Sequence, residues 1–437
     1  MNFLKDTTEC LKSELDLFMM PPLNTSIEQG QFEAIIPTVN QDKSIQFSYI
    51  GTDEYIDLSK CFIDLTARIY KADGLNKVNI ETADAVGPIN NFFHSAISQI
   101  EIKLNNTIIE NTNTTYPYKA YLSDLLNYNQ DAKESYLQST LFVKDRAGYM
   151  NNLAQTKTEN NTKTEGNDGF WERKKMINGG SVNMCGRLHC DIFNSDRYLL
   201  NKVNITITVK FSSPDFCLLW SEDTKKYGFH METMVLMLRK VKISPAVANA
   251  HNNTLMKSLA CYPIKRTSVN DFSIDTVGKK FATTILDGKI PSRLVLGLVT
   301  NSAFMGNRKE NPFNFEHFNM TKLSLKCNGV LSPYKEPLEF DFEKNNYMSG
   351  FRTLFDGIDN SERGNNISRY DYANGFTLFA FDFTPDMCSS DHFNLEKTGS
   401  ITVAIEFSKA VNKSLTLIVF SEYDDIIYID KNRQVIN

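Results

Sequence analysis

The sequence lacks the features that mark membrane and secreted proteins. No apolar run approaches the roughly 18 residues that a membrane-spanning helix needs. The longest runs, such as 415–420, have the length of a β-strand. Asp6, Glu9 and Glu14 stand where a secretory signal peptide would be apolar. We therefore expect a protein that is made inside a cell and is not secreted.

Basic patches and paired cysteines are missing as well. The net charge is −5, and residues 1–50 hold three lysines against seven acidic residues. Direct binding of nucleic acid draws most of its affinity from basic side chains, so we expect protein partners and no sequence-specific contact with nucleic acid. The cysteines are scattered without a secretion signal, which favours free thiols over a disulfide framework. They lie at 10, 61, 185, 190, 217, 261, 327 and 388.

Motifs for enzymatic chemistry are absent too. Neither G-x-S-x-G nor H-E-x-x-H occurs. Gly278-Lys279-Lys280 lacks the upstream glycine and the following Ser or Thr of a phosphate-binding loop. The carboxylates of two short acidic segments are interpreted as exposed strand or turn charges; they are Asp341, Glu343, Asp424 and Asp425. We assign no catalytic residue and no cofactor.

Two groups of residues come nearest to a metal or catalytic site. Cys185, His189 and Cys190 form the segment CGRLHC, but a zinc site needs four ligands and a second pair is missing. His189 and Cys190 are also neighbours on a predicted strand, so they should point to opposite faces. His94 and His317 have no acidic or nucleophilic neighbour in sequence, and we expect each to close a turn or pack at the start of a strand. We assign no metal ligand.

The chain contains an internal repeat. Residues 91–106 (NFFHSAISQIEIKLNN) match residues 314–329 (NFEHFNMTKLSLKCNG) without gaps. His94 and His317 occupy the same position in the two copies. Apolar and polar residues alternate in both, as expected for a half-buried strand that ends in a turn, at Asn105-Asn106 or at Asn328-Gly329.

Two further pairs follow in the same order. Residues 118–126 resemble residues 347–355. The first copy predicts a short helix, with Thr115 as a cap and Pro117 in the first turn. Residues 204–212 (NITITVKFS) then match 400–408 (SITVAIEFS), again with strict alternation. Such alternation is typical of antiparallel sheets with one wet face, and three co-linear matches indicate a duplicated chain.

The fold prediction follows from this duplication. We expect an all-β protein of two tandem eight-stranded jelly rolls with short inserted helices. The predicted units are an N-terminal arm (1–35), jelly roll 1 (36–245), a connector (246–260) and jelly roll 2 (261–437). Residues 151–169 are polar and should form a mobile surface loop. Further strands are expected in the short apolar segments 45–50, 57–71, 187–193, 233–243, 262–274, 291–300, 376–383, 414–421 and 425–430.

Longer strings give the chain a family resemblance. Among them are ECLKSELDLF (9–18), VGPINNFFHS (86–95), GNRKENPFNFEHFN (306–319) and NGFTLFAFDFTPD (374–386). With these strings, the chain resembles the double jelly-roll major capsid proteins of Polinton (Maverick) elements and adintoviruses nearly end to end. The resemblance implies a homotrimeric, pseudo-hexagonal capsomer of an icosahedral double-stranded DNA virus shell, located in the virion. It also implies contacts with neighbouring capsomers and with penton and minor capsid proteins.

Two other functional classes stay open from the residues alone. One is an enzyme on tandem jelly rolls resembling the bacterial peptide-N-glycosidases, which would need a carboxylate cluster between the domains and a secretion signal. The other is a sugar-binding attachment protein, which would need aromatic residues on exposed loops. Residues 151–169 contain no aromatic side chain.

The N-terminal arm is unusually apolar for a chain end. It carries Leu11, Leu15, Leu17, Phe18, Met19 and Met20, followed by Pro21-Pro22. Frayed termini seldom hold such a dense apolar cluster. We expect the arm to dock on a neighbouring capsomer, a capsid-lining protein or an inner membrane.

Overall fold

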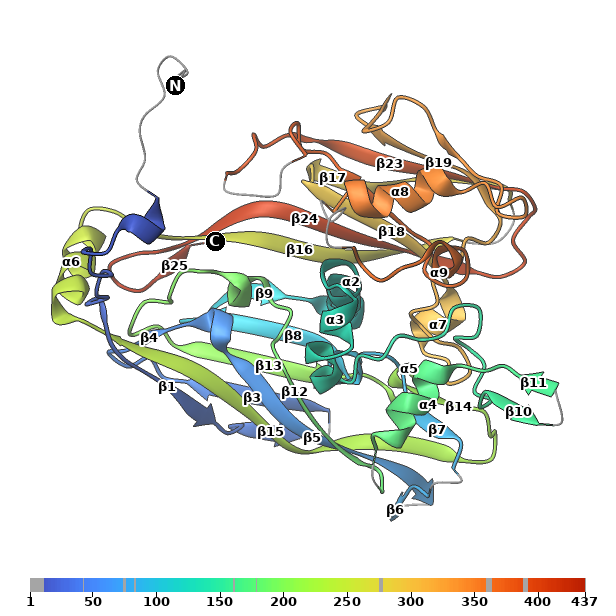
Figure 1. The fold of residues 1–437 in the computed structure, drawn as a ribbon, viewed down its shortest axis with the longest axis horizontal. Helices are drawn as coiled ribbons and strands as arrows, with labels where there is room; N and C mark the ends of the chain where they lie inside the picture. The colour runs from blue at the N-terminus through green and yellow to red at the C-terminus, as the bar shows by residue number, and fades with distance from the viewer. Residues whose placement is uncertain are drawn as a thin grey trace.

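The fold is seen in a computed structural model, which describes residues 12–41, 43–73, 76–81, 84–159, 162–177, 179–274, 278–358, 364–387 and 392–436. Two antiparallel β-sandwiches lie side by side, and short helices gather between them and at their ends (Figure 1). The apolar residues between the sheets form one continuous core cluster that extends through both sandwiches.

The first sandwich is built from two facing sheets. One sheet has the order β1-β15-β5-β12, formed by β1 (Ile27–Ile35), β15 (Lys226–Ile243), β5 (Phe62–Asp73) and β12 (Ser181–Gly186). The other has the order β3-β13-β8-β9, formed by β3 (Ser44–Tyr49), β13 (Ile205–Phe211), β8 (Ile97–Leu104) and β9 (Thr107–Asn111). Smaller strands extend these sheets: β2 (Val39–Gln41), β4 (Tyr55–Ile56) and β6 (Asn76–Asn79).

The second sandwich repeats this topology strand for strand. Its first sheet has the order β16-β24-β18-β22, formed by β16 (Ala260–Ile274), β24 (Leu415–Ile429), β18 (Arg293–Thr300) and β22 (Leu378–Asp382). Its second has the order β17-β23-β19-β20, formed by β17 (Lys280–Lys289), β23 (Thr398–Phe407), β19 (Met320–Cys327) and β20 (Val330–Leu331). Two small strands, β21 (Leu338–Glu339) and β25 (Val435–Ile436), are added at β19 and β24. The described residues therefore form two jelly rolls with the same four-plus-four strand order, as predicted.

The matched segments of the sequence occupy equivalent places. In the first jelly roll Ile207 on β13 is paired with Ile102 on β8, and in the second Val403 on β23 is paired with Leu325 on β19. Both hairpins turn where the sequence predicted. Asn105 and Asn106 have φ of 45° and 71°, and Asn328 and Gly329 have φ of 52° and 81°. Positive φ at both central residues is the conformation that tight hairpins require.

Short helices are inserted at corresponding points. After β9 comes α2 (Tyr116–Asn127), and before β22 comes α8 (Met348–Asp356), which confirms the predicted helical pair. Thr115 precedes α2, but its hydroxyl makes no capping bond and donates to the carbonyl of Val269 on β16 (2.9 Å). The other helices are α1 (Phe92–Ser95), α3 (Gln130–Lys133), α4 (Asp168–Lys175), α5 (Pro214–Cys217), α6 (Pro245–Leu255), α7 (Asn301–Met305) and α9 (Arg369–Ala373).

The two jelly rolls share a tightly packed boundary. Tyr121 on α2 stacks on Phe313 of the second jelly roll, with ring centroids 4.0 Å apart. Lys119, also on α2, is buried and places its Nζ 2.6 Å from both Glu110 Oε1 and Asp191 Oδ1. Asp191 Oδ2 in turn accepts a hydrogen bond from the backbone N–H of Thr267 on β16 (3.0 Å). Buried charges of this kind must be paired to be tolerated, so they tie α2 to both domains.

Three sequence expectations are corrected by the structure. The arm does not extend to residue 35, because residues 27–35 form β1 and pair with β15 through backbone bonds. Residues 151–169 are not a plain loop: they hold the hairpin β10 (Lys157–Glu159) and β11 (Thr162–Thr164) and the start of α4. Residues 187–193 are not a strand, since β12 ends at Gly186 and a short 3-10 turn, Asp191–Asn194, follows.

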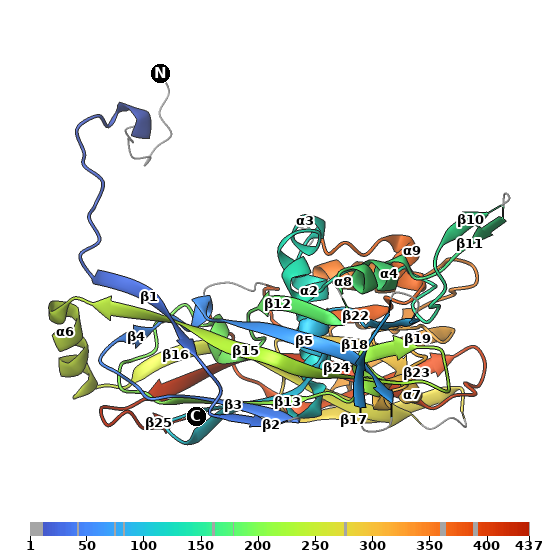
Figure 2. The same cartoon turned by 90° about the horizontal axis from the view of Figure 1, so that it is seen from below.

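The part of the N-terminal arm that is described stands clear of the sandwiches. From residue 26 backwards the chain leaves the body, passes a single 3-10 turn at Ser13–Leu15, and projects away from both sheets (Figure 2). Leu11 lies outside the described residues. Among the residues that the structure describes, no helix is long and apolar enough to cross a membrane.

Candidate assembly site

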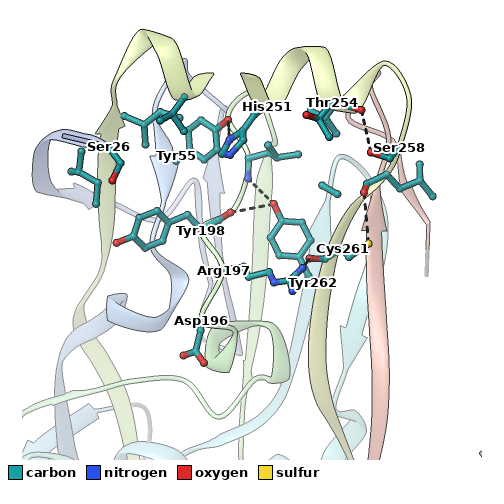
Figure 3. A pocket seen from close by; sticks show the side chains of 17 residues that line it. Ser26, Tyr55, Asp196, Arg197, Tyr198, His251, Thr254, Ser258, Cys261 and Tyr262 are labelled. Carbon is teal, nitrogen blue, oxygen red and sulfur yellow. Dashed lines mark hydrogen bonds between the residues drawn. The ribbon is translucent and has the colours of Figure 1, made fainter. Parts of the chain in front are cut away.

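A large hollow lies at the end of the molecule from which the arm departs. It has a volume of about 640 Å³ and opens between α6, the start of β1 and the start of β16 (Figure 3). Its apolar lining includes Ile27, Ile243, Val247, Leu255, Leu259 and Tyr262. Cavities of 300–1,000 Å³ with mostly apolar walls and a few polar groups are the usual form of binding sites in proteins.

The connector between the jelly rolls shapes one wall of this pocket. Pro245 occupies the first turn of α6, where the missing N–H costs nothing. The backbone N–H of Ser244 donates to the carbonyl of Ser26 (2.9 Å), which fastens the base of the arm to the start of α6. The pocket therefore forms where the arm, the connector and both jelly rolls meet.

Polar groups hold the pocket's floor in place. The hydroxyl of Tyr262 donates to the carbonyl of Tyr198 (3.2 Å) and accepts from the N–H of Leu200 (3.0 Å). Tyr55 and His251 are joined by a hydrogen bond between the phenol oxygen and Nδ1 (3.1 Å). Because these groups are satisfied within the chain, the remaining exposed surface of the pocket is chiefly apolar.

The arm that leaves the rim of this pocket carries exposed apolar side chains. Leu17 is 76% exposed, Phe18 93%, Met20 87% and Leu23 86%. Ser26 and Ile27, the next residues of the chain, lie on the pocket's rim. A chain that carries both a cluster of exposed apolar side chains and an open apolar hollow has surfaces typical of interaction sites.

The structure brings the candidate residues His94 and His189 together, which the sequence did not predict. His189 lies in coil rather than on a strand, and its Nε2 is 3.0 Å from Asp124 Oδ1 on α2. The ring of His94 packs against that of His189, with centroids 4.7 Å apart. Potential ligand atoms of His94, Asp124 and His189 all lie within 4.8 Å of one another. Sequence reasoning missed this cluster because its members come from three segments.

Each member of this cluster has a protein partner. His94 Nδ1 is 2.9 Å from the hydroxyl of Tyr116, and Asp124 Oδ2 accepts a hydrogen bond from Asn91 Nδ2 (2.7 Å). The same Tyr116 oxygen accepts a hydrogen bond from the backbone N–H of His189 (3.2 Å). This N–H is therefore satisfied by a side chain and not by a β-strand. We interpret the cluster as a buried network that ties α1, α2 and the segment after β12 together.

Charge in this network follows from burial. Burial, with His189 adding to it, lowers the pKa of His94 to about 3. Burial alone would raise the pKa of Asp124, but the His189 ring and the Asn91 amide hold it below its usual value. At neutral pH the network therefore contains a neutral His94 and an ionised Asp124.

The remaining candidates lie apart from this network. His317 accepts a hydrogen bond from the N–H of Asn319 (2.9 Å) and stacks on Phe342, so it closes the turn before β19. Asp424 and Asp425 pair with Lys265 and Arg266 on the neighbouring strand β16, and Asp424 is buried rather than exposed as the sequence suggested.

The other charged segments and the thiols are also placed. Asp341 pairs with Lys344 within its own turn (2.9 Å), Glu343 is exposed, and the segment 278–280 leads into β17. Free thiols occur at Cys61, Cys185, Cys190, Cys217, Cys261 and Cys327. Cys10 and Cys388 lie outside the described residues.

Comparison with known proteins places the fold. No family model matches the sequence. The uncharacterized protein F54H12.2 of Caenorhabditis elegans is 25% identical over 396 residues, which cover 87% of this chain and 90% of that protein.

Solved structures match over nearly the whole chain. A chain of the Sputnik virophage structure matches with a TM-score of 0.62 and 11% identity, over 99% of this chain and 92% of its own. The mavirus major capsid protein matches with a TM-score of 0.53 and 11% identity, over 100% and 96%. The PBCV-1 virus capsid matches with a TM-score of 0.58 and 9% identity, over 96% and 99%. The two sandwiches and their order along the chain are thus the double jelly-roll fold that viral major capsid proteins have.

Proposed function

We propose that this chain is the major capsid protein of an icosahedral double-stranded DNA virus shell and that it acts as a structural protein, not as an enzyme. The observation that carries the proposal is the repetition of one four-plus-four strand order in two jelly rolls that fill the chain. Full-length likeness of fold to viral capsid chains supports it. The virion is its proposed location, after synthesis in a host cell.

The duplication gives a physical reason for a trimer. Three copies of a two-domain chain offer six similar barrels, so a threefold capsomer can occupy a nearly sixfold lattice position. The packed boundary between the jelly rolls, with Tyr121 on Phe313 and Lys119 between two carboxylates, supports a rigid tile. We propose a homotrimer as the building unit and neighbouring capsomers as its main partners.

The finer assignment rests on the sequence. The strings at 9–18, 86–95, 306–319 and 374–386 resemble capsid proteins of Polinton elements and adintoviruses. We propose that the chain belongs with them, and that penton and minor capsid proteins complete its shell. In this proposal the buried His94 and Asp124 and the half-buried His189 support the fold and have no role in catalysis or metal binding.

Two measurements on the purified chain test the function. Mass measurement in solution should give three times 49.8 kDa, and negative-stain microscopy should show pseudo-hexagonal rings or closed shells. A strictly monomeric chain at micromolar concentration that forms neither would exclude the capsid function. The two open alternatives would then be separated by assays for glycopeptide hydrolysis and for glycan binding.

A further inference from the structure

We propose that the pocket beside α6 receives the apolar segment 17–20 of the N-terminal arm of a second copy of this chain. The proposal deepens the capsid function and rests on it, because only an assembly brings the arm of one copy to the pocket of another. The arm is then the occupant of the pocket, and the pocket is the binding partner of the arm.

The pocket has room for this segment. Its volume of about 640 Å³ is about four times that of an engineered cavity of about 150 Å³ that binds benzene. Ile27, Ile243, Val247, Leu255 and Leu259 line it with aliphatic surface. Leu259, at its edge, is still 44% exposed. A phenyl ring and one or two flexible thioether side chains suit walls of this kind, because Met adapts to irregular gaps.

The arm supplies side chains of this kind in a short, partly shaped segment. Residues 17–20 are Leu, Phe, Met and Met, and Phe18 is 93% exposed. The N–H of Met19 bonds to the Asp16 carboxylate (3.2 Å), which closes a local turn around them. Within the described residues of a single copy nothing covers this cluster. Leaving it in water is unfavourable, so contact with apolar surface is expected.

The direction and stiffness of the arm favour binding to the pocket of a second copy over binding to the pocket of its own chain. Ser26 is fixed at the rim by its bond to Ser244. Pro21-Pro22 favour an extended chain of about 3.1 Å per residue, which sets Met20 on the order of 19 Å from Ser26. In Figure 2 the described part of the arm leaves the rim and projects away from α6 and from both sheets. A return would need a sharp reversal within residues 21–25.

The arrangement can propagate. Every copy carries one arm and one pocket at the same end, so each can give an arm to one neighbour and accept an arm from another. Such head-to-tail contacts close into rings or extend through a lattice. The arms would then join copies along one surface of the shell.

Disulfide trapping between two differently labelled chains tests the proposal. One chain carries Phe18→Cys and the other carries Thr254→Cys, an exposed pocket residue on α6. Cys261, which lines the pocket, and Cys10, which precedes Phe18 in the sequence, are replaced by Ser in both chains so that they cannot compete in the oxidation. The chains are mixed, assembled and oxidised, and the products are separated without reductant. A covalent dimer of the two chains is expected; its absence from assembled shells would overturn the proposal.

A matched control fixes the position on the arm. Ile36→Cys replaces Phe18→Cys; Ile36 is 72% exposed and follows the far end of β1. This chain should give no dimer with the Thr254→Cys chain. Equal yields from Ile36→Cys and Phe18→Cys would mean non-specific collision and would also overturn the proposal.

A pair of charge variants tests the pocket itself. Leu259→Glu places a carboxylate at the edge of the lining, whereas Met256→Glu changes a 71% exposed side chain of the same segment that does not line the pocket. In the labelled mixture, Leu259→Glu in the acceptor chain should lower the dimer yield at least tenfold, and Met256→Glu should not. An unchanged dimer yield with Leu259→Glu would show that the arm does not bind in the pocket.

Microscopy of the same samples separates this proposal from the proposed function. Rings or shells without the Phe18–Thr254 cross-link contradict the arm exchange and leave the capsid function standing. Failure of the untreated, unsubstituted chain to form trimers and shells contradicts the capsid function itself.

Discussion

The two jelly rolls have the same strand order but differ in how polar their interiors are. In the first, α2 brings a lysine, Lys119, into contact with two buried carboxylates, and Asp124 lies beside two histidines. In the second, the repeat places Met348 where Lys119 stands and Thr353 where Asp124 stands. Among the described residues, the helix α8 packs through rings without such charges: its Phe351 contacts Phe355 on the same helix and Tyr372 on α9.

This difference shows which parts of a duplicated fold are free to diverge. The sheets retain alternating apolar residues, because a one-residue change in pattern would turn the core face to water. The inserted helices are not bound by this alternation, so their side chains can change without exposing the core face of a sheet. In the first copy α2 supplies buried ion pairs at the boundary between domains as well as aromatic packing, whereas in the second copy α8 packs through rings.

Removal of the Lys119 charge should have the largest effect. Lys119→Met gives the first jelly roll the residue of the second but leaves Glu110 and Asp191 buried without their cation. We expect the free energy of unfolding to fall by about 3–5 kcal/mol. Chemical denaturation measures it. Lys322→Met, which breaks an exposed pair with Glu339, is the control and should change little; similar losses in both would contradict the buried network.

Substitutions that create equivalent cavities in the two cores should have the second-largest effect. Ile102 and Leu325 are repeat partners on β8 and β19, with 0% and 4% exposure. Ile102→Ala and Leu325→Ala should each cost about 2–5 kcal/mol. Because the boundary is tightly packed, calorimetry should show one unfolding transition that both variants shift. Two transitions, each moved by one variant, would show that the jelly rolls unfold separately.

The two repeat-related histidines should make the fold sensitive to acid. Burial lowers the pKa of His94 to about 3 and that of His317 to about 4, against an ordinary value of 6.5. A lowered pKa means that the unfolded chain binds the proton more tightly, so stability is full above pH 6.5 and is lost as the pH falls. Each histidine contributes up to about 1.4 kcal/mol per pH unit.

Glutamine at either position should reduce this slope. Urea denaturation of His94→Gln and His317→Gln between pH 7.5 and 4 measures it against the unsubstituted chain. We expect His94→Gln to reduce the slope at least as much as His317→Gln, because His94 is more deeply buried. A slope that neither variant changes would place the acid sensitivity elsewhere.

Truncation of the arm should have a small effect on folding. Residues 12–25 pair with no strand, whereas β1 begins at Ile27. Deletion of residues 1–25 should leave the trimer and its melting temperature nearly unchanged and impair shell formation. Deletion of residues 1–35 also removes β1 and should lower the melting temperature. A trimer lost in the shorter deletion would place the arm in the core.

Chelator and reductant should have the smallest effect. The described thiols are free, and the ring and carboxylate atoms of His94, Asp124 and His189 have protein partners. Thermal melts with and without either reagent should coincide. A fall of several degrees with chelator would mean that the His94 cluster holds a metal ion.

Local patterns in the sequence were sufficient to predict the repeated strands. Ile100, Ile102 and Leu104 alternate with polar residues and end at Asn105-Asn106, so burial and turn are both encoded within ten residues. The helix predicted over 118–126 and observed at Tyr116–Asn127 also follows from local signals, namely Pro117 and the spacing of the apolar residues. Both predictions depend only on residues that are close in sequence, and tertiary contacts do not override them.

Elements held by distant contacts could not be predicted. The strand β1 is mostly exposed and forms because β15 offers a free edge, so its sequence shows little alternation. The segment after Gly186 looked like a strand, but Asp191 is fixed by Lys119 and Thr267, 72 and 76 residues away. The pocket could not be predicted from the sequence either, because its walls come from β1 and β4 on the one hand and from α6 and β16 on the other, which are far apart in the chain.

The hairpin of β10 and β11 has a practical consequence. It projects from the end of the molecule opposite the arm and α6 (Figure 1). Exposed hairpin tips tolerate insertions better than any other part of a domain. If arms join neighbouring copies as proposed, a foreign peptide inserted between β10 and β11 would lie at the end of each copy that these contacts leave free. The chain would then serve as a scaffold for the dense, ordered display of an antigen.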